Sequence, residues 1–316
     1  MNLFVQDLRF WLRRQSAWRD LSQAVRHLGL PEFLRRTFLW PKILRTAPTR
    51  SKPWVRGGAV ELHTMCHEDD WLLVIWMLKS LARVMGELPP LVIHIQRLPR
   101  PSALVALRHH FPDARLMLPE ELVPMVSEYL VARHLTRCRD WLWREPILNK
   151  LVTFQIVASS TNVIWVDSDV LFFNKPEEFA QLTDKPLDRI YFQEDCTVSF
   201  TLTPEQALEH LGIPITKRIN AGLLMRSRDS IRLEKVEELL GHPMVGVPSG
   251  LIDQTLQALC ACADGMADNL PRSYAIQLEE DIDPGSIVCR HYAGPTRAWI
   301  STQGMRWLIQ HGILRS

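Results

Sequence analysis

From residue 60 onward, short apolar runs rich in β-branched residues alternate with longer stretches of helical periodicity. Strands and helices that alternate along a chain are typical of a mostly parallel sheet covered by helices. We therefore predict an α/β fold with a Rossmann-like sheet. The expected strands are 60–65, 91–95, 114–118, 163–166, 221–226 and 287–290, and the expected helices are 69–84, 102–111, 146–158, 230–240 and 251–263.

Charge is distributed unevenly along the chain. Residues 1–56 contain twelve Lys and Arg but only three Asp and Glu, so this segment carries a net charge of +9. Because the whole chain of 316 residues carries +2, the remaining 260 residues carry −7. The stretch 46–56 has two prolines and no periodicity, which is typical of a linker. We place the domain boundary there, between an N-terminal helical extension (1–56) and a larger domain (57–316).

The sequence shows no membrane span and no signal peptide. The longest helical apolar run, 71–78, has eight residues, whereas a bilayer needs about 20. Near the N-terminus, Arg9, Arg13 and Arg14 interrupt every apolar stretch. We therefore expect a cytoplasmic protein, in which the six cysteines are reduced thiols. Cys260 and Cys262 are explained by a buried helix, because no second metal-binding pair follows them.

Two carboxylates directly follow one of the expected strands. The triplet Asp167-Ser168-Asp169 comes after the apolar run 163–166, at the sheet edge where open α/β sheets bind their ligands. Unpaired carboxylates this close repel each other, and a divalent cation relieves that repulsion. The alternative is a turn with acidic caps.

A second group of chemically useful residues lies near the C-terminus. An imidazole such as that of His291 can complete a shell of oxygen and nitrogen ligands around manganese. Gly294 permits a close approach of the backbone to a ligand, and Arg297 can bind a phosphate with two hydrogen bonds. A structural histidine is the alternative for His291 taken alone.

Four motifs in order make a more specific pattern. They are the triplet at 167–169, Asn220-Ala221-Gly222 before a strand, Asp253-Gln254 at the start of a helix, and the ending His291-Tyr-Ala-Gly-x-x-Arg-x-Trp. Together they resemble the retaining glycosyltransferases of family eight, which include glycogenin and bacterial lipooligosaccharide galactosyltransferases. The resemblance spans roughly residues 60–300. The family ending usually has lysine and proline where this chain has Arg297 and Ala298.

The resemblance implies a GT-A fold, a UDP-sugar as donor substrate and a bound Mn²⁺ or Mg²⁺. Asp167, Asp169 and His291 correspond to the metal ligands, with Ser168 between the two carboxylates. The activity implied is transfer of a hexose to a saccharide or lipid-linked acceptor with retention of the anomeric configuration. Retaining transfer proceeds by double displacement or by same-face attack, and an amide at position 254 favours the latter.

The resemblance also assigns roles to five further residues. Lys150 matches a basic residue that contacts the donor, and a solvated lysine is the alternative. Asn220 resembles an asparagine that contacts the sugar, and a turn residue is the alternative. Asp253 and Gln254 resemble the pair that flanks the anomeric carbon, although Asp253 also suits a helix cap. Thr64, at the end of the first strand, is expected near the nucleotide base.

Three other functions compete with this interpretation. A sugar-nucleotide pyrophosphorylase is disfavoured, because no glycine-rich loop follows the first strand. A glycoside hydrolase would use two carboxylates without a metal. A catalytically silent sugar-nucleotide-binding or scaffold protein is the third. The acceptor and the oligomeric state are not determined by the sequence, but Trp141 and Trp143 lie in a candidate acceptor wall at 119–146.

The N-terminal extension has an amphipathic pattern. Its apolar stripe consists of Phe4, Leu8, Trp11, Trp18, Leu21, Val25 and Leu28. Basic residues fall largely away from this stripe, and four of the eleven tryptophans precede residue 55. We predict that residues 1–45 place the protein peripherally on the inner, anionic face of a membrane. Packing on the larger domain or on a second subunit is the alternative, and nucleic acid is not expected as a partner.

Overall fold

Seven strands form the central sheet of the computed structural model, which describes residues 29–55, 58–97 and 99–315. Across the sheet, the strands are β3 (Arg115–Met117), β2 (Leu91–Ile95), β1 (Val60–Cys66), β4 (Asn162–Val166), β7 (Ile219–Ser227), β6 (Ile190–Glu194) and β8 (Ala267–Asn269). The pairs β3–β2, β2–β1, β1–β4 and β6–β8 are parallel, whereas β7 is antiparallel to both of its neighbours. The predicted α/β fold with a mostly parallel sheet is confirmed.

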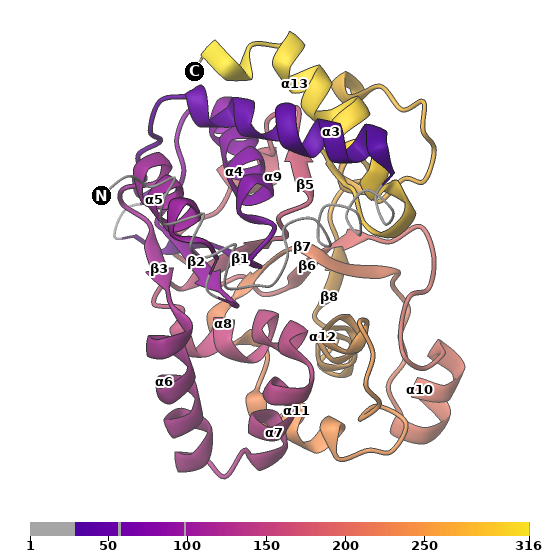
Figure 1. Cartoon of the computed structure of the whole chain (residues 1–316). Coiled ribbons are helices and arrows are strands. Elements are labelled where there is room, and N and C mark those ends of the chain that lie inside the picture. The colour runs from indigo at the N-terminus through magenta and orange to yellow at the C-terminus, as the bar shows by residue number, and fades with distance from the viewer. Residues whose placement is uncertain (1–28, 56–57, 98, 316) are drawn as a thin grey trace.

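Helices cover both faces of this sheet (Figure 1). On one face lie α4 (Trp71–Met85), α5 (Pro101–His110) and α13 (Arg306–Gln310). On the other lie α6 (Pro119–Ala132), α7 (Thr136–Arg144), α8 (Val152–Val157), α11 (Leu233–Leu240) and α12 (Ile252–Ala263). The helix expected at 146–158 is split: η2 (Pro146–Lys150) is a 3-10 helix, and α8 begins only after Leu151.

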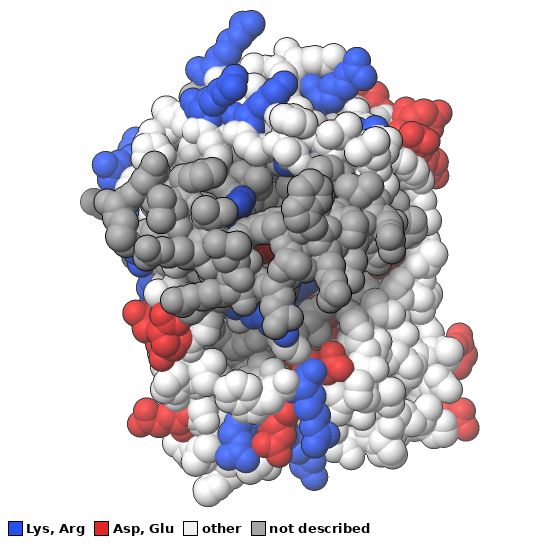
Figure 2. Space-filling view, viewed as in Figure 1, with Lys and Arg blue, Asp and Glu red and all other residues white. Residues whose placement is uncertain are grey.

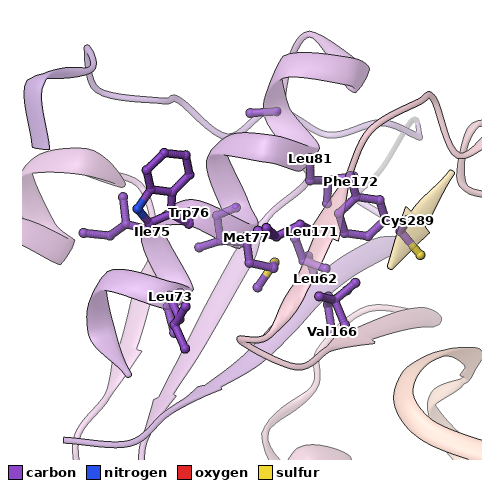
Figure 3. Packing of buried hydrophobic residues seen from close by; sticks show 14 of the residues in the cluster. Leu62, Leu73, Ile75, Trp76, Met77, Leu81, Val166, Leu171, Phe172 and Cys289 are labelled. Atoms are coloured by element: carbon purple, nitrogen blue, oxygen red, sulfur yellow. The ribbon is translucent and has the colours of Figure 1, made fainter. Parts of the chain in front are cut away.

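Strand β4 shows why the sheet is apolar on both sides. Ile164 and Val166 belong to the core under α4, whereas Val163 and Trp165 belong to the core on the opposite face. Because successive side chains of a strand point to opposite faces, a strand covered on both faces is largely apolar along its length. Figure 3 shows Val166 packed with Leu62 and with side chains of α4.

Two short strands outside the main sheet lie beside it. β5 (Val170–Phe172) pairs antiparallel with β9 (Cys289–His291), so that Val170 faces His291. Leu171, Phe172 and Cys289 pack against α4 in the same core (Figure 3). Neither β5 nor this pairing was predicted, and β6 and β8 were missed as well. The expected strand 287–290 forms at its C-terminal end only, as β9.

The N-terminal segment that the structure describes packs on the C-terminal one. α3 (Leu30–Phe38) leads into the 3-10 helix η1 (Trp40–Arg45). The buried Trp40 donates to the Ser301 hydroxyl at 2.8 Å, and its carbonyl accepts from the Trp76 indole at 3.0 Å. Residues 1–28, with the predicted stripe, lie outside the described residues.

Contacts also hold the described part of the predicted linker, 46–55, against the fold. The buried Lys79 of α4 donates to the carbonyl of Ala47 and to the hydroxyl of Thr49. Ser51 forms an isolated bridge with Leu88. The domain boundary in this stretch stays a prediction. Within the described residues, no helix is long and apolar enough to cross a membrane.

Candidate active site

The topology brings the predicted metal ligands together at one edge of the sheet. Asp167 follows β4, and its amide donates to the Gly222 carbonyl of β7 at 2.7 Å. Asp169 precedes β5, and pairing of β5 with β9 puts His291 next to it, with 3.1 Å between His291 Nε2 and Asp169 Oδ1. One ligand atom from each of Asp167, Asp169 and His291 lies within 4.8 Å of the others. The structure thus joins residues 124 positions apart in the sequence, as predicted.

Opposite charges dominate the electrostatics of this group. Burial alone would raise the pKa of Asp169, but His291, Arg297 and Lys150 lower this pKa to about 2. Burial alone would lower the pKa of His291, but the carboxylate of Asp169 raises this pKa above its usual value. A carboxylate held ionised beside an imidazole suits a divalent cation, because binding replaces the shared proton with a metal.

The residues around the group fit a metal centre. His291 Nδ1 lies 3.0 Å from the Asn220 side-chain oxygen, so a proton on Nδ1 can be donated there and Nε2 is left for a ligand. Asn220 in turn donates to Asp195 at 3.0 Å. Two carboxylates and an imidazole are donors that Mn²⁺ accepts, and Mg²⁺ prefers the carboxylates. Asn220, predicted to contact the sugar, orients His291 in this structure.

Gly222 makes room for the histidine. A Cβ at this position would lie 2.1 Å from His291 Cε1, which is far inside van der Waals contact. We expect Gly222→Ala to displace His291 and to lower the free energy of unfolding by about 1–3 kcal/mol. Denaturant unfolding measures this change.

Gly250→Ala is the matched control for that measurement. No atom lies within 4 Å of a Cβ added at Gly250, so its unfolding free energy should change by less than about 0.5 kcal/mol. Equal stability of both variants and of the wild type would contradict the tight packing of His291 on Gly222.

Two cations border the acidic group. Lys150 Nζ lies 2.5 Å from Asp167 Oδ2 and is buried, which excludes the solvated alternative. Burial alone would lower the pKa of Lys150, but Asp167 and Asp253 raise this pKa above its usual value. Arg297 binds Asp70 with 3.0 and 3.2 Å contacts, and it lies 3.8 Å from Asp169. Both cations therefore lie beside the carboxylates, and their binding of a phosphate stays a prediction.

Asp253 and Gln254 lie in the first turn of helix α12. Asp253 is 2% exposed, and its Oδ2 has no hydrogen-bond partner among the described residues. Burial, together with the charge of Asp167, raises the pKa of Asp253 to about 6 despite the nearby Lys150. Leu251 occupies the N-cap position, so Asp253 is not the helix cap. Gln254 accepts from the Ala221 amide at 3.1 Å and donates to the Ser199 carbonyl at 2.7 Å.

The remaining predicted residues are less informative. The Thr64 side chain is fully buried and its hydroxyl has no partner among the described residues, so contact with a base remains a prediction. Ser168 is half-buried, and Gly294 is exposed with φ +53°, a left-handed conformation that favours glycine.

Sequence reasoning missed two acidic residues of the site. Asp70 occupies the N-cap position of α4, but its carboxylate makes no cap hydrogen bond and binds Arg297 instead. Asp195, which holds Asn220, lies beyond a strand that was not predicted. No local signal marks either role, since each depends on a partner at least 25 residues away.

A cavity of about 270 Å³ lies at the carboxyl end of β2, and none of Asp167, Asp169 and His291 lines it. Apolar side chains of α6 and α7 form much of its wall, and Arg97 and Arg139 line it as well. Asn149, next to Lys150, also lines it. Of the two tryptophans predicted in an acceptor wall, Trp143 lines the cavity and is 62% exposed, whereas Trp141 is buried in packing.

Comparison with solved structures places the fold. Mouse xyloside xylosyltransferase 1 matches with 13% identity and a TM-score of 0.51, over 79% of this chain and 99% of that one. The glycosyltransferase GlyE of Streptococcus pneumoniae TIGR4 matches with 12% identity and a TM-score of 0.47, over 81% of this chain and 63% of that one. The galactosyltransferase LgtC matches with 14% identity and a TM-score of 0.45, over 79% and 95%. No family model and no curated protein sequence matches the chain. The first match carries the argument, and it confirms the predicted GT-A fold.

Proposed function

We propose that the chain is a metal-dependent glycosyltransferase of the family-eight kind. It would move a hexose from a nucleotide-diphosphate sugar, a UDP-sugar, to a saccharide or lipid-linked acceptor with retention of configuration. The observation that carries the proposal is the convergence of Asp167, Asp169 and His291 at the carboxyl edge of β4 in a GT-A fold. Ligands of open α/β sheets bind at that edge.

The cations of the site would hold the diphosphate. When bound by Asp167, Asp169 and His291, Mn²⁺ or Mg²⁺ would supply positive charge for the departing nucleoside diphosphate. Lys150 and Arg297 flank the same carboxylates and would add charge in a site shielded from water. Arg297 would give up its ion pair with Asp70 and bind a phosphate of the donor instead, because a guanidinium binds carboxylates and phosphates alike.

Asp253 and Gln254 would orient the sugar. The unpartnered oxygen of Asp253 would accept a hydrogen bond from a sugar hydroxyl, which would satisfy a buried polar atom. The Gln254 amide is held at both ends by backbone groups and is a poor nucleophile. The acceptor hydroxyl would therefore attack the anomeric carbon on the face that the diphosphate leaves, and the cavity beside Asn149 and Trp143 would hold the acceptor.

The proposal is tested with a panel of nucleotide-diphosphate sugars. The purified chain is incubated with each donor and Mn²⁺, and release of the nucleoside diphosphate is measured with and without EDTA. The proposal predicts slow hydrolysis of one donor that EDTA abolishes and added Mn²⁺ restores. Acceptor trials with that donor then follow. Release of pyrophosphate from a sugar phosphate and nucleoside triphosphate would favour a pyrophosphorylase, and no turnover of any donor would favour a silent binding protein.

Substitutions at Arg297 separate a need for charge from a structural need. We expect Arg297→Lys to keep turnover within about tenfold of the wild type, and Arg297→Ala to lower it by about 100-fold, because positive charge near a phosphate is what the site requires. Donor hydrolysis by purified variants measures both.

Asp70→Asn is the control for this pair. It removes the ion pair between Arg297 and Asp70 and leaves the 3.8 Å pair with Asp169 in place. Its turnover should stay within about threefold, as for a residue outside the reacting groups. Equal losses in Arg297→Lys, Arg297→Ala and Asp70→Asn would show that the Arg297–Asp70 pair has a structural role instead.

A further inference from the structure

Helix α3 presents an apolar stripe to solvent. Leu30, Leu34 and Phe38 are 55%, 42% and 68% exposed, and their spacing of four residues puts them on one side of the helix. Leu44 of η1 is exposed as well. A surface helix normally turns its apolar side toward the core, so a stripe that faces outward indicates a partner.

Basic residues are abundant in the segments that carry this stripe and pack beside it. The segments 30–45 and 300–315 together contain six Lys and Arg and a single acidic residue, Glu32. Lys42 and Arg306 line one groove between the two segments. Lys42, Arg45, Arg306 and Arg315 are exposed, and none of them forms an ion pair with any residue that the structure describes. Figure 2 shows Lys and Arg gathered along the top of the molecule, where Figure 1 places α3 and α13.

We infer that this face, α3 with η1 and the C-terminal segment 306–315, docks on an anionic lipid surface. Leucine and phenylalanine side chains enter the boundary between headgroups and acyl chains, and cations around them bind the phosphates. Nucleic acid would not account for three exposed apolar side chains. The inference does not depend on the proposed function, since it concerns residues outside the candidate active site.

The segment that carries the face is fixed to the rest of the fold. Trp40 ties η1 to Ser301 and to α4, so the apolar stripe is carried by a segment packed into the core of the fold. The predicted amphipathic residues 1–28 precede it in the sequence and lie outside the described residues. The face thus extends to described residues the membrane contact that the sequence predicts for 1–45.

Vesicle flotation tests the inference on the full chain. The probes are vesicles of phosphatidylcholine alone and vesicles with a third of phosphatidylserine. Wild type is expected to float with the anionic vesicles only, and to lose that association in high salt. Two double variants change the face. One combines Leu34→Ser with Phe38→Ser, and the other combines Lys42→Glu with Arg306→Glu. Each should bind anionic vesicles about tenfold more weakly than the wild type.

Matched controls change an exposed apolar residue and an exposed cation elsewhere. Leu208→Ser with Lys185→Glu should float as the wild type does. Circular dichroism of all variants checks that they are folded. Flotation of the two face variants at wild-type affinity would overturn the inference, as would the absence of wild-type flotation. A dimer of the wild type that both face variants dissociate, without any vesicle binding, would assign the face to a second copy of the chain instead.

Discussion

Alanine at Asp167, Asp169 or His291 is expected to lower donor turnover by about 100-fold or more in each case, while the fold persists. Each substitution removes one of the three side chains whose ligand atoms converge within 4.8 Å. The measurement is hydrolysis of the best donor in excess Mn²⁺, with thermal unfolding to show that each variant is folded.

His67→Ala is the control for these three variants. His67, Glu68 and Asp69 form a second group of possible ligands on the loop before α4, where the proposed mechanism assigns them no task. This variant should keep turnover within about threefold of the wild type. Near-native activity in the variants of Asp167, Asp169 and His291 would show that the metal assignment is wrong.

Asp253→Asn is expected to abolish most activity and to stabilise the protein. The folded-state pKa of Asp253 is raised from 3.8 to about 6, so its charge costs stability above pH 6, and that cost vanishes as the pH falls below 3.8. A shift of this size corresponds to about 2–3 kcal/mol at pH 8. The neutral amide avoids the cost but presents a different group to the sugar, so we expect turnover to fall by about 100-fold.

The measurement for Asp253→Asn is denaturant unfolding at pH 8 and at pH 4.5, in EDTA so that no metal contributes. The variant should exceed the wild type in unfolding free energy at pH 8, and the difference should shrink at pH 4.5. A variant less stable than the wild type at pH 8 would mean that the carboxylate makes a stabilising interaction in the folded state.

The strands that carry the site were predictable because their signal is local. The run 163–166 is apolar at every position, which is typical of a strand buried on both faces, and Asp167 and Asp169 follow directly. The core of the parallel half, β1, β2 and β4, was found in the same way. β6 and β8 were not found, because Ile190–Glu194 mixes polar with apolar residues and Ala267–Asn269 is too short for a periodic signal.

The sequence pattern did not predict the direction of the strands or the long-range partners of the site residues. Periodicity does not encode that β7 runs antiparallel, although this reversal puts Gly222 beside Asp167. The role of Asn220 as the partner of His291, and that of Asp70 as the partner of Arg297, depend on residues 71 and 227 positions away. The motifs identified the candidate metal ligands, whereas the groups that contact them had to come from the structure.

Binding of Mn²⁺ is the most direct test of the account, and it does not require the donor or the acceptor to be known. Electron paramagnetic resonance of free Mn²⁺, titrated with the chain alone, measures the bound fraction. The account predicts one bound ion for each wild-type chain, no binding to Asp169→Ala or His291→Ala, and undiminished binding to His67→Ala. Equal binding by the wild type and the variants of Asp169 and His291, or no binding by the wild type, would contradict it.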